Sequence, residues 1–182
     1  MGPLRTPAER SVAISSPSCA CSAADDEAAA ERLLTALRWP SAPQCPFCRS
    51  RGVYALGGTG SGRSRLKCSV CRRQFTVTKS TVLEGTHLPL RLWLRIAEAL
   101  TAQPARLSVA VLERDLGLGR TAARNVLARL VYAAQRPPLA GLLARGGDLH
   151  RPSFHGLTPH DLLAALLATA APTDAPRDEL VV

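Results

Sequence analysis

The sequence predicts an α+β fold in which a small antiparallel β-sheet precedes a group of helices. Three observations support this prediction. Two pairs of cysteines flank short β-prone runs between Gln44 and Val77, apolar residues recur at helical spacing after Pro89, and both ends of the chain lack periodicity. We therefore expect an ordered centre with disordered termini.

The composition argues for small modules rather than one large core. Aromatic residues make up 4% of the 182 residues, and much of the hydrophobic fraction is alanine, which buries little area. We divide the chain into a disordered leader, an N-terminal helix with a sheet, a three-helix region, and a tail holding a linker, a short helix and a disordered end: residues 1–24, 25–80, 81–136 and 137–182.

The first helix is predicted directly after the leader. Asp25 and Asp26 stand at its start, and leucines share one face of the run that follows. The run ends at Trp39-Pro40, because a residue before proline is disfavoured in a helix. We expect this short amphipathic helix to serve in packing.

The next region carries paired cysteines in the pattern C-x2-C, nineteen residues, C-x2-C. A two-residue gap lets one tight turn present two sulfurs to the same ion, and four thiolates match the tetrahedral preference of Zn²⁺. We predict a zinc ribbon with one structural zinc and no catalytic metal, since thiolates fill every position; a redox dithiol and an iron–sulfur site are the alternatives. The predicted ligands are Cys45, Cys48, Cys68 and Cys71, whereas Cys19 and Cys21 in the leader lack further ligands nearby.

Three β-prone runs accompany the cysteines and predict the strands of the ribbon. They are Val53 to Leu56, Arg65 to Lys67, and Gln74 to Val77.

Helical periodicity marks residues 81–136. A stripe from Leu92 to Leu100 predicts one helix, and two more are expected over 108–116 and 120–134. Gly117 between the last two permits a tight left-handed turn, as a helix-turn-helix requires. A plain three-helix bundle is the alternative.

The second helix of this pair carries the predicted base-reading residues. Arginine can read guanine and asparagine can read adenine in the major groove, and an arginine farther along can contact phosphate. The base-reading candidates are Arg120, Thr121, Arg124 and Asn125, and the phosphate candidate is Arg129.

The charge of the chain is concentrated in its middle. The formal net charge is +9, and residues 45–80 alone hold eight basic side chains and no acidic one. A field of this kind suits a polyanion, so we predict double-stranded DNA as the partner. The ribbon residues predicted to contact it are Arg63, Arg65, Lys67, Arg72, Arg73 and Lys79.

The tail contains one further helix start. Thr158, Pro159 and Asp161 form an N-cap, a first-turn proline and an acidic first turn. The final residues are expected to be disordered. With no export signal and no spanning run of apolar residues, we expect a cytoplasmic, nucleoid-associated protein with reduced thiols and no membrane partner.

Together these residues resemble a known family. The runs RWPSAPQCPFCRS and RLKCSVCRRQFTVTKSTVLEGTHLPLRLWL are similar to the transposase zinc-ribbon domain, the amino-terminal module of bacterial insertion-sequence transposases. The likeness covers about residues 25–93 and continues loosely to 134. It implies recognition of the terminal inverted repeats of such an element.

The resemblance also implies where a catalytic domain would lie. Full-length relatives continue into an RNase H-like domain with an acidic metal-binding set, and only 46 residues follow Arg136 in this sequence. The acidic residues there have no predicted strands to bring them together. We therefore expect no enzyme activity and no catalytic residue, as in a truncated or remnant transposase.

Three alternatives remain open at this point. The chain could be a transcriptional regulator built on the same module, a zinc-ribbon module that docks onto proteins, or the DNA-binding half of a split transposase. The candidate protein partners are a second copy of the chain or a separately encoded catalytic chain.

Overall fold

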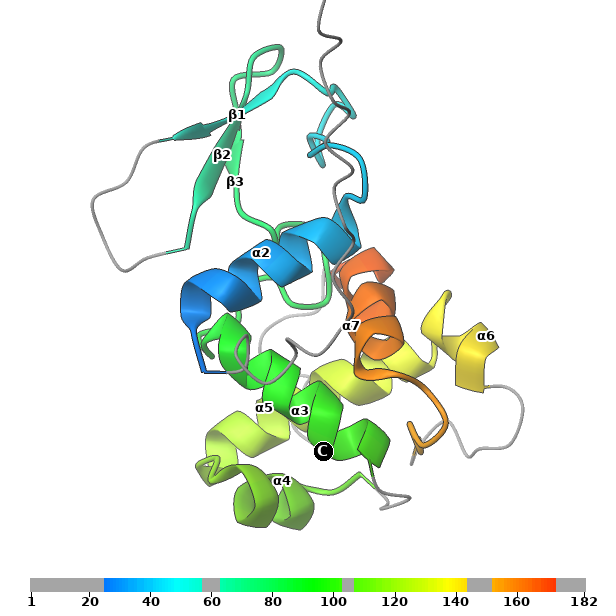
Figure 1. The fold of residues 1–182 in the computed structure, drawn as a ribbon. Coiled ribbons are helices and arrows are strands. Elements are labelled where there is room, and N and C mark those ends of the chain that lie inside the picture. The colour runs from blue at the N-terminus through cyan, green and yellow to red at the C-terminus, as the bar shows by residue number, and fades with distance from the viewer. Residues whose placement is uncertain (1–24, 57–62, 103–106, 144–151, 173–182) are drawn as a thin grey trace, which may run out of the picture.

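The structure is a computed structural model that describes residues 25–56, 63–102, 107–143 and 152–172. The leader with Cys19 and Cys21, and the last ten residues, lie outside these ranges. The described residues form six helices, labelled α2 to α7, and one three-stranded sheet (Figure 1). The fold is α+β, as the sequence predicts. The sheet and the cysteines form the ribbon, residues 40–75, and the six helices form the helical body.

The ribbon is an antiparallel sheet in the order β1-β2-β3, built from β1 (Val53–Leu56), β2 (Arg65–Cys68) and β3 (Gln74–Phe75). Leu66 pairs with Phe75, and Val53 pairs with Cys68. The third strand ends two residues before the predicted limit of Val77. Successive turns begin there, with the N–H of Lys79 donating to the carbonyl of Thr76 at 3.1 Å.

The first helix, α2 (Glu27–Arg38), begins at Asp26, whose carboxylate accepts hydrogen bonds from the backbone N–H groups of Ala28 and Ala29. It ends at Trp39, before Pro40. Its buried residues, Ala30 and Leu34, lie in the core of the helical body, where α2 packs against α3 and α7. The helix that precedes the ribbon in sequence thus belongs to the helical body in space.

The next three helices follow the predicted stripes closely: α3 (Leu90–Ala102), α4 (Val109–Leu116) and α5 (Arg120–Ala134). Ser108 caps α4, and Gly117 ends it in the left-handed conformation, with φ of 63°. Only Gly117, Leu118 and Gly119 separate α4 from α5, which pack against each other. Leu118 is buried in the turn between them.

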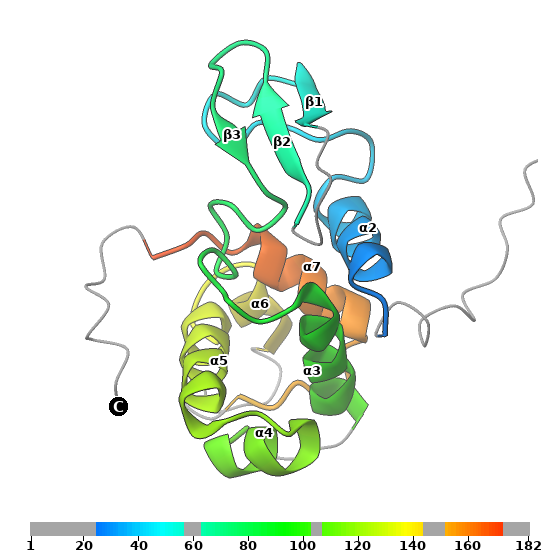
Figure 2. The same ribbon diagram turned by 90° about the vertical axis from the view of Figure 1, so that its left-hand side faces the viewer.

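The tail contributes α6 (Leu139–Leu143) and α7 (Pro159–Ala168), and α7 lies among the other helices (Figure 2). It packs against both α2 and α3. Thr158 is its N-cap, as the sequence predicts, and the structure shows that Thr158 and Asp161 form a complete capping box. The structure adds α6, which was expected as linker, because five residues are too few to show helical periodicity.

An irregular stretch, the connecting segment (residues 76–89), joins the ribbon to α3. Five of its apolar and threonine side chains are buried, and the N–H of Val82 donates to the carbonyl of Thr169 at 2.9 Å, just beyond α7. The segment is therefore part of the core and fixes where the ribbon leaves the helical body. The buried members are Val77, Thr78, Thr81, Val82 and Leu83.

None of the helices in the described ranges is both long enough and apolar enough to span a membrane.

Candidate metal centre and basic surfaces

The four predicted cysteines meet at one point of the ribbon. Their sulfur atoms all lie within 4.8 Å of one another. Across the pairs, the Sγ atoms of Cys45 and Cys71 are 3.6 Å apart, and those of Cys48 and Cys68 are 3.5 Å apart. The fold therefore brings two sequence-distant knuckles together into one four-thiol cluster.

This spacing fits a tetrahedral zinc ion. Four Zn–S bonds of about 2.3 Å place the sulfurs of a tetrahedron about 3.8 Å apart, close to the separations found here. Thiolates occupy all four positions, so the centre holds one structural zinc and leaves no position open for substrate. When bound, the ion stabilises a region whose buried core, among the described residues, consists of Cys45, Cys68 and Phe75.

The two knuckles have the same backbone hydrogen bonds. The N–H of Arg49 donates to the carbonyl of Cys45 at 2.9 Å, and the N–H of Arg72 donates to the carbonyl of Cys68 at 3.1 Å. Each first cysteine in turn donates its N–H to the carbonyl five residues later. Each C-x2-C motif is thus a tight turn that aims both of its sulfurs at one ion.

The thiols differ in acidity. Hydrogen bonds from the backbone N–H groups of Cys71 and Val70 lower the pKa of the Cys68 thiol to about 6, although burial opposes this. At Cys71 the N–H of Arg73 also lowers the pKa, but burial and the neighbouring thiols raise it to about 11. Four crowded thiols cannot all ionise without a cation between them, which is the arrangement that a zinc ion satisfies.

An aromatic cluster supports the metal centre. The rings of Trp39 and Phe47 pack edge-on against Phe75, at centroid distances of 6.2 and 6.4 Å. Trp39 contacts the core of the ribbon and the core of the helical body alike. Trp39 therefore joins the two parts of the molecule.

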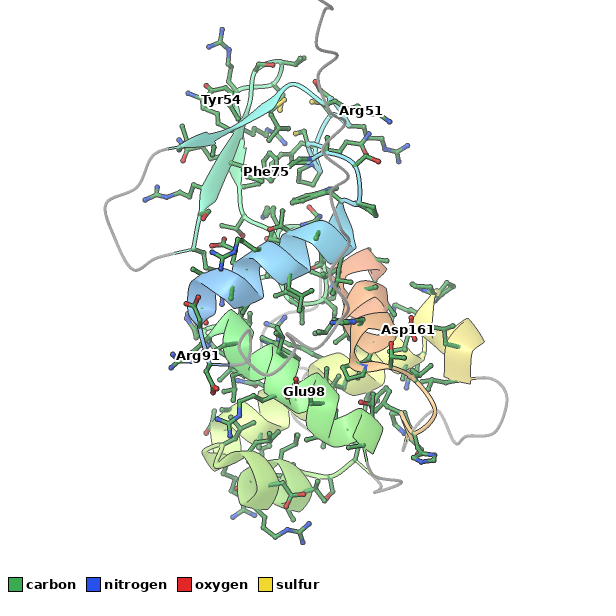
Figure 3. The ribbon with its side chains drawn as sticks, viewed as in Figure 1. Arg51, Tyr54, Phe75, Arg91, Glu98 and Asp161 are labelled. Atoms are coloured by element: carbon green, nitrogen blue, oxygen red, sulfur yellow. The ribbon has the colours of Figure 1, made fainter. Side chains whose placement is uncertain are left out.

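The predicted ribbon contacts divide into exposed and engaged side chains. Arg65, Arg72 and Arg73 are exposed and Lys67 is half-buried. Lys67 pairs in register with Tyr54, so the two side chains share the outer face of the sheet. Figure 3 shows Tyr54 on this part of the ribbon, with Phe75 on the side of α2. Sequence reasoning missed Tyr54, because strand alternation alone does not say which face is covered.

Three other predicted contacts hold the connecting segment instead. Arg63 donates to the carbonyls of Thr86 and Leu88 at 3.1 and 2.7 Å. Lys79 forms an ion pair with Glu84. Arg129 of α5 donates to the carbonyls of Val82 and Glu84.

Arg38 is not among the predicted site residues, but it also holds the connecting segment. It donates to the carbonyls of Val77 and Lys79 and lies 4.5 Å from the ring centroid of Trp39. Burial lowers its pKa to about 10, while the charge of Glu84 acts to raise it, so the guanidinium remains charged at neutral pH. Two half-buried arginines, Arg38 of α2 and Arg129 of α5, therefore fix the connecting segment.

The predicted readers on α5 lie where an external partner can reach them. Their side chains are exposed, and α5 contains no acidic residue. They occupy the first two turns of the helix, directly after the tight turn that follows α4. These residues are Arg120, Thr121, Arg124 and Asn125.

No second cluster suited to metal binding occurs within the described ranges, where the four cysteines are the only close group of three or more His, Cys, Asp or Glu side chains. Asp161, the acidic residue at the start of α7, accepts hydrogen bonds from Thr158 in the capping box. The structure assigns this carboxylate a local structural role.

Comparisons with known proteins bear on the ribbon. The family model described as the transposase zinc-ribbon domain matches residues 25–74, which run from the start of α2 to β3. None of the curated proteins and none of the solved structures compared with the chain matches it. The match includes α2, which packs on the helical body, so the family unit extends beyond the sheet and the cysteines. The family suggested by the cysteine knuckles is thereby confirmed for residues 25–74, which match the transposase zinc-ribbon domain.

Proposed function

We propose that this chain binds double-stranded DNA in a sequence-specific manner, as the DNA-binding module of an insertion-sequence transposase does, and that its sites are the terminal inverted repeats of an element. Three features support the proposal. The family match covers the ribbon, one structural zinc fits its cysteines, and the net charge of +9 is concentrated around them.

The exposed start of α5 is the strongest support for sequence-specific binding. Four polar side chains, two of them arginines, project from its first two turns, and Gly117 and Gly119 border the turn that precedes it. A recognition helix in the major groove uses its N-terminal residues to read bases. We propose that α4 and α5 act as a helix-turn-helix, with Arg124 and Asn125 as the main readers.

The ribbon supplies the second part of the proposed surface. Arg65, Lys67, Arg72 and Arg73 are assigned to phosphate contacts, which position a protein on DNA without reading sequence. Arg63, Lys79 and Arg129, whose charged groups are hydrogen-bonded to the connecting segment or paired with Glu84, are left out of this surface.

Binding alone, without phosphoryl transfer, is the proposed activity. Such transfer needs two metal ions held by carboxylates, and the only metal-binding cluster in the described ranges is the closed four-cysteine centre. We also propose that the chain acts in the cytoplasm, on nucleoid DNA.

The test begins with selection of bound duplexes from random DNA by the zinc-loaded chain. Affinity for the selected duplex and for an unrelated duplex is then measured by fluorescence anisotropy for wild type, Arg124→Ala, Asn125→Ala and the control Arg95→Ala. Arg95 is an exposed arginine on α3 and lies outside the proposed surface. Each reader variant should lose about 1–3 kcal/mol on the selected duplex only.

The alternatives give other results. A chain that selects no sequence but binds every duplex would act without base reading. A chain that binds no duplex would contradict the proposal and favour a protein-docking role. Equal losses in Arg124→Ala and Arg95→Ala would show that net charge, rather than α5, sets the affinity.

A further inference from the structure

Arg49 and Arg72 occupy equivalent positions in the two cysteine knuckles. Each follows the second cysteine of its pair, and each donates its backbone N–H to the carbonyl of the first. Both residues are in the left-handed conformation, with φ of 59° and 61°. The fold therefore presents two arginines in the same way, one from each side of a single metal centre.

This conformation is unfavourable for arginine. The Cβ atom of an L-residue clashes with its own backbone in the left-handed region, and glycine adopts it without that clash. No contact of the two arginine side chains with the described residues offsets this conformational cost. Both are exposed, and neither guanidinium makes a hydrogen bond or ion pair with a described residue. The knuckle turn itself explains the left-handed backbone, since the N–H of each arginine closes the turn onto the first cysteine. Glycine would fit that turn without the clash, so an external anion is the better explanation for arginine at both positions.

The surroundings of the pair suit an anion. No acidic residue occurs between residues 45 and 80, and Arg51 and Arg73 are exposed near the knuckles. Figure 3 shows Arg51, two residues after Arg49, on the ribbon and well away from Arg91 and Glu98 of the helical body. The knuckles thus form a basic surface separate from α5.

We propose that Arg49 and Arg72 form a paired phosphate contact, each binding a backbone phosphate of the duplex that α5 reads. This inference rests on the proposed function, which already assigns Arg72 to a phosphate, and it adds Arg49 as the matching contact from the other knuckle. Because phosphates are alike in every sequence, the pair strengthens binding to all duplexes equally. It also implies that DNA binding favours arginine at these two positions, whereas folding stability favours glycine.

The test uses the double variant Arg49→Gly with Arg72→Gly, which removes both charges and the strain together. A second double variant, Arg49→Lys with Arg72→Lys, keeps the charges. The control, Arg91→Ala with Arg95→Ala, removes two exposed arginine side chains from α3, so that net charge falls equally. Measurements on the zinc-loaded chain are the salt dependence of affinity for the selected and an unrelated duplex, the thermal midpoint, and zinc release to a chelator.

The glycine variant should reduce the slope of log affinity against log salt by about 1.8, which is two phosphates at about 0.9 each. Its thermal midpoint and zinc retention should not fall, and the lysine variant and the α3 control should keep the full slope. A lower midpoint or faster zinc release, with DNA binding unchanged, would instead assign the arginines to the metal centre and overturn the inference.

A glycine variant that binds like wild type, while Arg124→Ala loses affinity, would overturn this inference and the assignment of Arg72 to a phosphate, and would leave sequence-specific binding through α5 intact. Loss of slope in the α3 control equal to that in the glycine variant would also overturn it, because bulk charge would then explain the effect. Absence of DNA binding by the wild type would remove the proposed function, and this inference with it.

Discussion

Arg129, in the middle of α5, donates a hydrogen bond to the backbone carbonyl of Glu84 at 2.9 Å. A second bond from the same nitrogen reaches the carbonyl of Val82. Burial lowers the pKa of Arg129, against the opposing effect of the Glu84 charge. The helix proposed to read DNA is thus connected at its centre to the segment that carries the ribbon.

Replacement of Arg129 should therefore affect stability first. Arg129→Ala removes charged hydrogen bonds to two carbonyls and is expected to lower the free energy of unfolding by roughly 1.5–3 kcal/mol. Arg124→Ala, an exposed arginine on the same helix, should leave stability unchanged. Chemical denaturation followed by circular dichroism makes the comparison. Equal stability of the two variants would show that the bonds of Arg129 contribute nothing.

The zinc centre gives a prediction with an internal control. Cys68→Ser should lose the single zinc ion and unfold the ribbon, because the small core around Phe75 cannot fold it alone. Most helical signal should remain, since α2 packs on the helical body. Cys19→Ser should keep one zinc per chain by native mass spectrometry. Full zinc occupancy in Cys68→Ser would contradict the assignment.

Glu84 predicts a component of acid sensitivity. Burial alone would raise the pKa of this carboxyl, but hydrogen bonds from Lys79 and the Ser80 N–H, with the charges of Lys79 and Arg129, lower it below 4.5. Its stabilising effect is complete above the unfolded-state pKa and is lost as pH falls through the lower folded-state value. The Glu84→Gln variant carries no charge at this position, so it does not lose this stability as the pH falls.

The measurement is the free energy of unfolding of wild type and Glu84→Gln at a series of acidic pH values. The gap between them should narrow as pH falls below 4.5, while acid loss of zinc affects both alike. Glu98→Gln is the control, since the Glu98 side chain forms no hydrogen bond with a described residue. A gap that stays constant with pH would contradict the prediction.

The tail helix should be essential to the fold. Leu166 in α7 is 1% exposed, and Leu166→Ala should lower the free energy of unfolding by about 2–5 kcal/mol through lost contacts and a cavity. Ala168→Ser, on the exposed side at the end of α7, serves as the control. Denaturant melts of the two variants decide the point, and equal stability would show that α7 is dispensable.

Incubation with DNA and Mg²⁺ or Mn²⁺ should produce no strand cleavage or joining. The carboxylate of Asp161 is bound within its capping box, and no acidic cluster occurs in the described ranges. Supercoiled plasmid carrying the selected sites provides a sensitive assay. Nicking that persists through further purification and disappears in Asp161→Ala would reveal a catalytic site in the tail.

Much of the local structure follows from sequence alone, because the causes are local. The side chains of Asp26 and Thr158 accept hydrogen bonds from the free N–H groups at the starts of α2 and α7. Gly117 ends α4 because glycine adopts the left-handed conformation easily. The sequence therefore predicts these helix boundaries. The metal ligands are predictable for a similar reason. Zinc requires thiolates in paired turns, and the C-x2-C motif encodes each turn directly.

Tertiary structure alone decided where these elements go. The amphipathic face of α2 could have covered the sheet, yet it packs on α3 and α7, which together offer many more buried apolar side chains than the small core of the ribbon. It also decided which basic residues remain free: Arg129 is half-buried and hydrogen-bonded to the connecting segment, while Arg124, five positions earlier, is exposed. The sequence gives an arginine its charge, but only packing determines whether its guanidinium binds backbone carbonyls of the same chain or remains free to bind an external partner.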